Sequence, residues 1–390
     1  MKLLIIGNGF DKKCKLNSSF KDYFESSITN KIDFGFLTGR ISASSIRGFI
    51  VANKKNLSSM NIIDILLMNA YYDKDPLWSD VEMYIFHLVY QKSDSNGLLV
   101  NSYWENLRII LNREIYSYDH LINNKDILTT ALDKDKFILM TMIYYSLLDQ
   151  EKTESPDSWV RFLNKEVHRF EDNFKEYLYA QSENNELYKN NSIKLYDFFF
   201  STIGQGLDIH SNFRVLSFNY TDAPSPYDSV TTYVHGKLSH NRIIIGIDSS
   251  KFDYNQHGYL FSKTYKKVEQ LLLPSKKNQF DIMENKYSHI MFFGHSLNEQ
   301  DYSYFQTIFD KFDLYNSSIA LTFYYSFYEG KEKNDIEMDQ VKAITKLIES
   351  YGKTLNNKYQ GKNLLHRMIN QNRINIIFLP DIDTLQFITK

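Results

Sequence analysis

The chain opens with an unbroken apolar run over residues 2–6, which glycine and polar residues end at once. Continuous apolar runs of this length are typical of strands buried on both faces of a parallel sheet. Comparable runs return from residue 213 onward, and segments with helical spacing separate several of them. They predict strands over 214–218, 231–234, 242–245, 289–293, 318–325 and 375–379, and helices over 261–272, 299–312 and 337–351. This alternation predicts an α/β protein with a mostly parallel sheet.

Between residues 40 and 210 the pattern is different, because apolar residues recur at helical spacing and proline is nearly absent. We therefore expect a large helical insertion over 40–210 after the first strand–helix unit, with residues 1–39 and 211–390 forming the sheet domain. Residues 17–19, Asn-Ser-Ser, have the composition of a helix start. The polar, asparagine-rich stretch 181–192 predicts an exposed loop.

The overall composition limits the environment and the partners. The 390 residues carry a formal net charge of −2, so no general basic signal indicates nucleic acid. The lone cysteine, Cys14, excludes an internal disulfide and fits a reducing cytoplasm. The apolar run at residues 3–6 is too short for a signal peptide, and no later apolar stretch reaches the length of a membrane span. We expect a cytoplasmic protein with no membrane partner.

Glycines follow the first predicted strand, in the motif Gly7-Asn8-Gly9-Phe10-Asp11. Glycine lets the backbone turn sharply and approach a ligand closely, and the amides at the start of the next helix can face a phosphate. The motif lacks the third glycine of a full dinucleotide-binding fingerprint and is not a Walker A loop. An ordinary turn over Gly7–Gly9 between a strand and a helix is the alternative.

A second polar motif, residues 217–222, lies where the strand predicted at 214–218 ends. In an open parallel sheet, ligands bind at the carboxyl ends of the strands. Asn219 offers a donor and an acceptor, and Asp222 offers an acceptor pair. The alternative is a turn at Asn219 and a helix cap at Asp222.

A histidine and a glycine, His235 and Gly236, end the strand predicted at 231–234. Histidine is the side chain best suited to exchange a proton near neutral pH, and the glycine clears space beside it. A histidine packed for structural reasons is the alternative.

The fourth motif, residues 293–301, follows the strand predicted at 289–293. Gly294 and Ser296 come directly after the strand, and Asp301 stands at the start of the next predicted helix. Ser296 could reach a phosphate or a ribose hydroxyl, and Asp301 could cap the helix or order the loop. Because all four motifs fall at carboxyl ends of strands, a parallel sheet would bring them to one edge and one pocket.

Other candidate residues carry weaker signals. The ten histidines show no His-x-x-x-His spacing, so we expect no metal site. Lys12, Lys13 and Lys15 either attract phosphates or form solvated surface charges. Trp78 and Glu82 lie four residues apart on one predicted helix face. They either close the pocket or form a core tryptophan beside a solvated glutamate.

These motifs together resemble the AbiH abortive-infection family of bacterial phage-defence proteins. Residues 3–11 and 19–23 look like the start of that family, and residues 78–82 resemble its Trp and Glu motif. Its later blocks resemble, in the same order, residues 217–222, 235–236 and 294–301. The resemblance extends from residue 1 to about 310 and covers the helical block only loosely. It implies an antiviral, abortive-infection effector.

The AbiH pattern is in turn similar to sirtuin-like domains, which bind NAD in a Rossmann-like fold. This similarity implies that His235 is the catalytic histidine and that Asn219 orients a water molecule or a ribose hydroxyl. It implies that Asp222 binds ribose or fixes Asn219. The nucleotide-binding positions that it implies are Gly7, Asn8, Gly9, Phe10, Asp11, Asp222, Gly236, Gly294, Ser296 and Asp301.

The resemblance implies hydrolysis of NAD, by cleavage of the bond between nicotinamide and ribose. Sirtuin deacetylases usually carry a zinc module with four cysteines, and this chain has one cysteine, so removal of acyl groups from lysine is not implied. Three alternatives stay open: a module that senses an ADP-ribose-like nucleotide without turnover, a nuclease, and a purely structural partner-binding protein. The near-neutral charge and the lack of an acidic metal cluster argue against the nuclease. The need to restrain NAD loss implies a phage-derived trigger or assembly into a homo-oligomer.

Overall fold

The structure is a computed structural model in which two compact units are distinguished. It describes residues 1–29, 32, 48–49, 52–53, 55–57, 59–64, 67, 71, 80–89, 158–201, 213–224, 231–239, 242–272, 281–284, 286–328 and 330–385. Unit 1 comprises Met1–Ser18, Tyr177–Ile244 and Glu269–Lys390, and unit 2 comprises Ser19–Glu176 and Ile245–Val268. The domain boundaries predicted at 39/40 and 210/211 lie outside the described residues.

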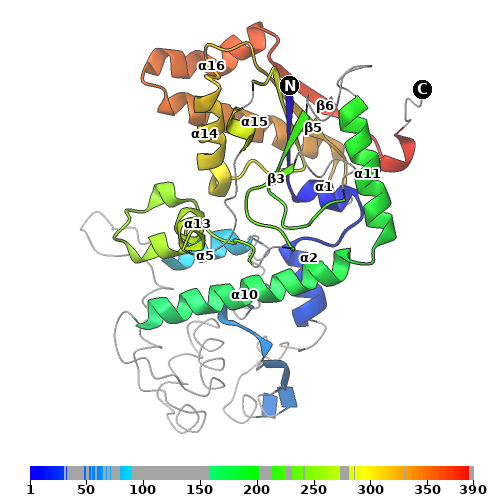
Figure 1. Cartoon of the computed structure of the whole chain (residues 1–390), viewed down its shortest axis with the longest axis vertical. Helices are drawn as coiled ribbons and strands as arrows, with labels where there is room; N and C mark the ends of the chain where they lie inside the picture. Colours follow the sequence, from blue (N-terminus) through cyan, green and yellow to red (C-terminus); the bar gives the residue numbers. More distant parts are fainter. Residues whose placement is uncertain are drawn as a thin grey trace. The chain divides into compact units, whose positions relative to one another are not determined.

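Unit 1 contains a parallel sheet of six strands (Figure 1). The strands are β1 (Lys2–Ile6), β2 (Phe213–Ser217), β3 (Thr231–Tyr233), β4 (His289–Phe293), β5 (Ala320–Tyr325) and β6 (Ile374–Phe378). Their spatial order is β3-β2-β1-β4-β5-β6, and every neighbouring pair is parallel. This order is that of the doubly wound dinucleotide-binding fold, and it confirms the predicted α/β class.

The register of the central strands aligns their carboxyl ends. Ile6 at the end of β1 pairs with Ser217 on one side and with Phe293 on the other. Ser217 in turn pairs with Tyr233 at the end of β3. Parallel strands in register deliver the loops that follow them to one edge of the sheet. The segments after β1, β2, β3 and β4 therefore all begin at the same edge.

One predicted strand, 242–245, is wrong. Residues 243–245 are buried, as their apolar character requires, but they join no ladder. The backbone N–H of Ile244 donates to the carbonyl of His235 at 2.9 Å. The N–H of Ile245 donates to the Glu171 carboxylate, and its carbonyl accepts from Lys266 Nζ. Side chains and a loop satisfy these backbone groups, so the segment needs no strand partner.

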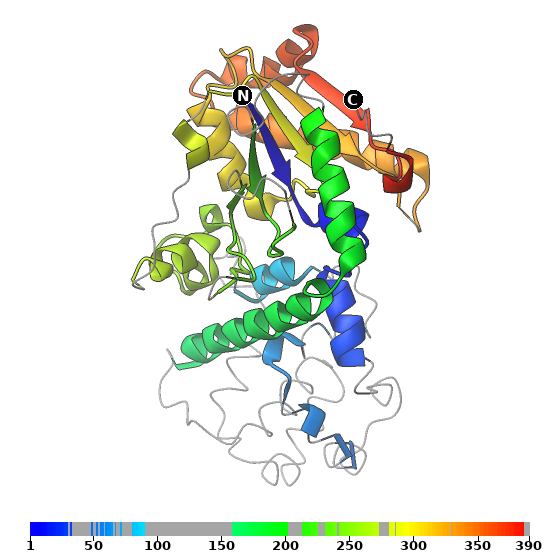
Figure 2. The ribbon, with the colours of Figure 1, turned by 45° about the vertical axis from the view of Figure 1, so that its right-hand side comes forward.

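Helices cover both faces of the sheet in unit 1. They are α1 (Asn8–Lys13), α11 (Glu186–Ser201), α14 (Tyr302–Lys311), α15 (Lys333–Thr354) and α16 (Lys358–Asn370), with the short turns η6 (Asp281–Glu284), η7 (Glu299–Asp301) and η8 (Ile382–Thr384). Figure 2 shows α11 crossing one face of the sheet. The predicted helices at 299–312 and 337–351 are confirmed by η7 with α14 and by α15.

The exposed loop predicted over 181–192 is wrong for most of its length. Helix α10 (Ser158–Ser182) ends and α11 begins within this stretch. Asn191 and Ser192 are buried, and their side chains donate to the carbonyls of Cys14 and Pro224. Asn185 accepts a hydrogen bond from the backbone of Tyr188. The polar residues therefore serve as tertiary partners and as a cap, which composition alone does not distinguish from a solvated loop.

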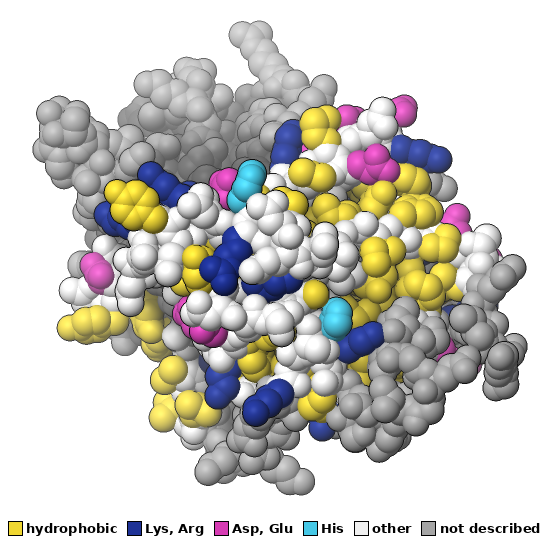
Figure 3. All heavy atoms as spheres, turned by 90° about the horizontal axis from the view of Figure 1, so that it is seen from above, with side chains coloured by type: hydrophobic (Ala, Val, Ile, Leu, Met, Phe, Trp, Pro, Cys, Tyr) yellow, Lys and Arg dark blue, Asp and Glu magenta, His cyan; other side chains and the backbone are white. Residues whose placement is uncertain are grey.

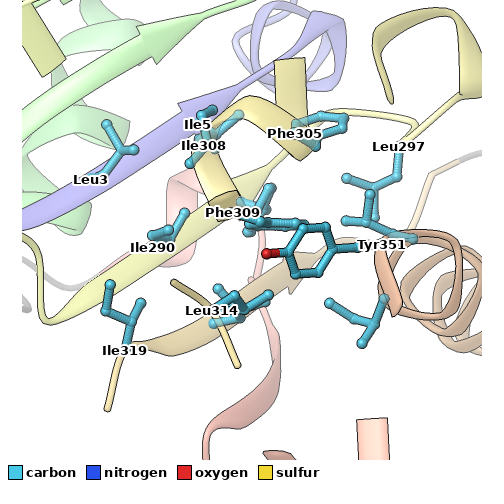
Figure 4. Close-up of a cluster of buried hydrophobic side chains, with 14 of the residues drawn as sticks. Leu3, Ile5, Ile290, Leu297, Phe305, Ile308, Phe309, Leu314, Ile319 and Tyr351 are labelled. Carbon is cyan, nitrogen blue, oxygen red and sulfur yellow. The ribbon is translucent and has the colours of Figure 1, made fainter. Parts of the chain in front are cut away.

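Alternate residues of β1 point into two hydrophobic cores. Leu3 and Ile5 join Ile290 and side chains of α14 and α15 on one face, as Figure 4 shows. Leu4 and Ile6 join Phe293 and side chains of α11 on the other. Burial on both faces explains why the strand is apolar without alternation. Each of these side chains contributes about 1.5–3 kcal/mol through burial.

Unit 2 contains α2 (Phe20–Phe24), η1 (Glu25–Thr29), α5 (Val81–Val89), η4 (Ser249–Lys251), η5 (His257–Phe261) and most of α10 and of α13 (Lys263–Gln270). The helix start predicted at 17–19 is confirmed, because Ser19 caps α2 in a reciprocal capping box with Asp22. The predicted helix at 261–272 is confirmed in its central part by α13. Within residues 40–210, the described residues are mainly helical.

The surface and hydropathy of the described residues are unremarkable. None of the helices among them is long and apolar enough to cross a membrane. On the face seen in Figure 3, lysine and arginine side chains are scattered among hydrophobic and neutral ones. This view agrees with the near-neutral net charge of the sequence.

Candidate functional site

The glycine motif after β1 forms a shorter turn than its sequence predicts. Helix α1 begins at Asn8, so Gly7 alone separates it from the strand. The N–H of Gly7 donates to the carbonyl of Phe293 at 3.1 Å, and the N–H of Gly9 donates to the carbonyl of Gly294 at 2.7 Å. The β1–α1 junction is therefore bonded directly to the segment that follows β4.

Three glycines allow these two backbones to meet. A Cβ at Gly294 would lie 2.3 Å from the backbone nitrogen of Phe10, and Gly294 has φ +70°. A Cβ at Gly9 would lie 2.6 Å from Gly294 Cα, and one at Gly7 would lie 2.7 Å from His295 Cα. The sequence suggested that these glycines admit a ligand. In the structure they admit another loop, and their contact with a nucleotide stays a prediction.

The two residues after the turn differ in exposure. Asn8 is exposed and accepts a hydrogen bond from Ser18 Oγ at 2.5 Å. Phe10 is fully buried and packs against Tyr196 and Phe293. The phenyl ring of Phe10 thus belongs to the hydrophobic core beneath the turn.

Asp11 is a buried carboxylate held by neutral donors. Its Oδ1 accepts from the Tyr188 hydroxyl at 2.8 Å, and its Oδ2 accepts from Thr221 Oγ1 at 2.6 Å. Burial raises the pKa of Asp11 from 3.8 to about 6, although the hydrogen bonds of Thr221 and Tyr188 and the amide of Asn219 lower it. Asp11 therefore joins the segments after β1 and β2 to helix α11.

Asn219 stands directly beside this carboxylate and follows β2. Its backbone N–H donates to Ser217 Oγ at 3.2 Å. Its side chain is 4% exposed. The amide lies close enough to the Asp11 carboxylate to lower the pKa of that group, but within the described part of the chain neither amide atom makes a hydrogen bond of normal geometry. A buried amide without partners costs about 1–3 kcal/mol, so a group that supplied them would bind favourably.

His235 follows β3 and is also buried, with 3% exposure. Gly236 beside it has φ +78°, and a Cβ there would lie 2.5 Å from the carbonyl oxygen of Arg242. The glycine therefore lets the segment before Ile244 fold back against the histidine, whose carbonyl accepts from the Ile244 N–H.

A carboxylate joins this histidine to a second one. Asp301 Oδ1 lies 3.0 Å from His235 Nε2, within a hydrogen bond. Asp301 Oδ2 lies 3.3 Å from His295 Nε2. Asp301 precedes α14, but its side chain makes no cap hydrogen bond there. Of the two roles that the sequence offered for Asp301, capping the helix is wrong, and the carboxylate instead faces two imidazoles.

Aromatic rings surround the two histidines. The Phe218 ring packs edge-on against both imidazoles, with centroid distances of 5.4 Å to His235 and 4.5 Å to His295. Tyr304 packs against His235, and Phe305 packs against His295. Apolar surroundings strengthen the electrostatic contact between the imidazoles and the carboxylate.

The other predicted polar residues lie nearer the surface. Asp222 Oδ2 accepts from the backbone N–H of Ser239 at 3.3 Å. Ser296 is exposed. Lys13 pairs with Asp381 at 3.0 Å, while Lys12 and Lys15 are exposed. Among the described residues, these side chains make no hydrogen bond or ion pair with Asp11, Asn219, His235 or Asp301.

Trp78 lies outside the described residues, and Glu82 is in unit 2. Glu82 Oε2 pairs with Lys263 Nζ at 2.9 Å, and its Oε1 accepts from the N–H of Gly246. The solvated glutamate that the sequence offered as an alternative is wrong, because this carboxylate is mostly buried and holds a backbone segment.

The structure thus brings the predicted residues together in two groups within unit 1. Asp11 and Asn219 form one group, and His235 and Asp301 form the other. Sequence reasoning missed Tyr188, Thr221 and His295. The signal for His295 was present, since it stands between two predicted site residues in the fourth motif. Among the described residues, no group of three or more His, Cys, Asp or Glu side chains could hold a metal ion.

Unit 1 therefore belongs to the class of parallel α/β domains with dinucleotide-binding strand order and polar residues at the carboxyl edge. The chain matches the sequence model of the family described as bacteriophage abortive infection AbiH over residues 3–325, and it belongs to that family. No curated protein and no solved structure matches it. The chain is thus an abortive-infection protein of phage defence.

Proposed function

We propose that this abortive-infection protein hydrolyses NAD at the bond between nicotinamide and ribose. The proposal is supported by one observation above all: buried polar residues from the segments after four adjacent strands are joined in two hydrogen-bonded pairs at one edge of the sheet. Thr221 after β2 bonds to Asp11 after β1, and Asp301 after β4 bonds to His235 after β3. Carboxyl edges of this strand order are where dinucleotides bind.

Hydrolysis of the nicotinamide–ribose bond requires few catalytic groups from the protein. Nicotinamide leaves as a neutral molecule with the electron pair of the broken C–N bond, and positive charge develops on the ribose, as in glycoside hydrolysis. A water oxygen then bonds to the same ribose carbon and gives up a proton. The products are nicotinamide, ADP-ribose and a proton. Positioning of the water and acceptance of its proton are the two tasks left for side chains.

His235 is the proton acceptor in this proposal, because it is an imidazole oriented by a carboxylate. Asn219 is the positioning group, because its buried amide has both a donor and an acceptor to offer. The bound water or a ribose hydroxyl would satisfy that amide. Asp222 stays a predicted ribose-binding residue.

A nucleotide-sensing module without turnover is the second candidate. The low exposure of His235 and Asn219, at 3% and 4%, favours it, since a reacting ribose must touch both side chains. Binding that left NAD intact under every trigger would support this second function.

The test is release of nicotinamide from NAD by the purified chain, with and without lysate of phage-infected cells as the trigger. We expect His235→Ala and Asn219→Ala each to lower the rate by roughly 10²–10⁴-fold. His366→Ala and Asn363→Ala, at exposed positions of α16, are the matched controls and should keep the wild-type rate.

Near-ultraviolet circular dichroism of each variant tests whether it remains folded. Wild-type rates in folded His235→Ala and Asn219→Ala would refute the assigned roles. Intact NAD in every wild-type reaction would refute the hydrolase.

A further inference from the structure

We propose that Asp301 and His295 are positioning residues that fix the tautomer of His235 and leave its Nδ1 as the proton-accepting atom. The structural part of this inference concerns which nitrogen carries hydrogen and stands by itself. The catalytic part rests on the proposed function. The argument begins at His295 and passes through Asp301 to His235.

The backbone fixes the tautomer of His295. The N–H of Leu297 donates to His295 Nδ1 at 2.9 Å. A nitrogen that accepts a hydrogen bond carries a lone pair and no hydrogen. A neutral imidazole has one N–H, so the hydrogen of His295 is on Nε2. That atom lies 3.3 Å from Asp301 Oδ2.

Asp301 has one oxygen left for His235. A carboxylate only accepts hydrogen bonds, and Oδ1 lies 3.0 Å from His235 Nε2. The hydrogen of a neutral His235 is therefore also on Nε2. Its Nδ1 then carries the lone pair and is the basic nitrogen. The same logic orients the histidine in Ser-His-Asp triads, where the carboxylate binds one ring nitrogen and leaves the other as the base.

Packing holds this arrangement in place. Phe218 contacts both imidazoles, so neither ring turns over without moving it. Leu297, which supplies the N–H to His295, is itself buried and has φ +56°. A non-glycine residue in this left-handed region is held there by its surroundings. The local backbone thus positions the Leu297 N–H, and this donor determines which nitrogen of His295, and through Asp301 which nitrogen of His235, carries the hydrogen.

The substitution Asp301→Asn gives an asymmetric prediction. The introduced amide can accept from one imidazole and must donate to the other. His295 keeps its hydrogen on Nε2, because the Leu297 N–H still occupies Nδ1. The amide oxygen therefore turns to His295 and the amide NH₂ to His235. His235 Nε2 then has to accept, and the hydrogen of His235 moves to Nδ1.

The experiment is long-range ¹H–¹⁵N correlation of the full chain labelled with ¹⁵N-histidine at pH 7.5, which distinguishes the two tautomers. His235→Gln and His295→Gln assign the two rings. We expect hydrogen on Nε2 of both rings in the wild-type protein. In Asp301→Asn, His235 should change to the Nδ1–H form while His295 stays unchanged. In Asp301→Asn combined with His295→Leu, the change at His235 should become incomplete, because the amide is free to turn.

The matched control is Glu299→Gln, which removes an exposed carboxylate two residues away that pairs with Lys346. Both tautomers should keep their wild-type form in this variant. Hydrogen on Nδ1 of His235 in the wild-type protein, or an unchanged His235 in folded Asp301→Asn, would overturn the inference.

Kinetics separate this inference from the proposed function. If NAD is hydrolysed, Asp301→Asn should lower kcat by roughly 10²–10⁴-fold and leave KM within a few-fold, because the base and not the binding surface is changed. A rise in KM as large as the fall in kcat would contradict a positioning role. If the tautomers are as inferred and NAD is never cleaved, the inferred hydrogen positions are confirmed and the proposed reaction is refuted.

Discussion

Asp11 and Asp301 are two buried carboxylates at the same edge of one sheet, and their surroundings differ in kind. Asp11 accepts hydrogen bonds from two hydroxyl groups, those of Tyr188 and Thr221. Asp301 faces two imidazoles, those of His235 and His295. Hydroxyl donors keep their hydrogens at neutral pH, whereas imidazoles exchange theirs there.

Under the proposed function, the difference separates a structural carboxylate, Asp11, from one that positions a reacting histidine, Asp301. Burial raises the pKa of Asp11 to about 6, although its hydrogen bonds lower it. Burial also raises the pKa of Tyr188 well above its ordinary value, so this donor stays a hydroxyl. Around Asp301, by contrast, the two partners are imidazole rings, whose nitrogens can donate or accept a hydrogen. We therefore expect proton transfer at His235, beside Asp301, and cohesion of the sheet edge at Asp11.

The largest predicted effect comes from a substitution that disturbs the surroundings of both Asp11 and Asp301. Gly294→Ala places a Cβ 2.3 Å from Phe10 nitrogen at φ +70°, where the β1 and β4 segments meet. Left-handed backbone costs roughly 1–2 kcal/mol and overpacking adds about 1–3 kcal/mol. We expect the free energy of unfolding by urea to fall by about 2–5 kcal/mol.

Gly330 supplies the matched control for this substitution. It has φ +86°, but nothing lies within 4 Å of a Cβ placed there. Gly330→Ala should therefore cost about 1 kcal/mol from the backbone alone. Equal losses in the two variants would show that the loops do not depend on their close approach.

A smaller effect is the pH dependence of the contribution that Asp11 makes to the free energy of unfolding. Asp11 has a folded-state pKa above its ordinary value, so the folded state favours the neutral acid. Its contribution to stability is fully present below about pH 4 and is lost as pH rises to about 6, by about 3 kcal/mol. Asp11→Asn has no such charge, so its stability relative to wild type should rise over this interval.

Urea unfolding at pH 4, 5, 6 and 7.5 measures this change. Glu299→Gln, at an exposed ion pair, is the control and should follow the wild-type curve. A difference between Asp11→Asn and wild type that stays constant with pH would contradict the raised pKa of Asp11.

The smallest effect concerns the donors of Asp11. Tyr188→Phe removes a hydrogen bond of 2.8 Å to a carboxylate. We expect a loss of about 1.5–3 kcal/mol at pH 7.5, where Asp11 is charged, and about 0.5–1.5 kcal/mol at pH 4, where it is neutral. Tyr359→Phe, at a position 82% exposed, should change neither value. A loss at Tyr188 that did not depend on pH would indicate packing and not the hydrogen bond.

The sequence predicts the central strands β1, β2, β4 and β5 well because they are buried on both faces, whereas β3 is half-buried and β6 is mostly exposed. An unbroken apolar run such as Leu3–Ile6 is seldom found outside a buried element of a globular protein, and all but one of the predicted strands are present. The failed strand, 242–245, is as apolar as the others. Its backbone bonds go to Glu171, Lys266 and His235, and sequence patterns do not reveal such partners.

The site was predictable in position and less so in its connections. His235 and Asp301 were both identified at strand ends, but their hydrogen bond spans 66 residues and follows from strand order. Tyr188 was hidden in a stretch whose composition indicates a loop. The glycines were correctly singled out for close approach, although the partner seen is backbone and not a ligand.

The most direct test of the central claim is the NAD content of cells that express the chain and are then infected with phage. NAD, nicotinamide and ADP-ribose are measured by mass spectrometry in cells with the wild-type chain and with His235→Ala. We expect NAD to fall and both products to rise with the wild-type chain alone. An unchanged NAD pool in cells where the wild-type chain still stops the phage would contradict the account.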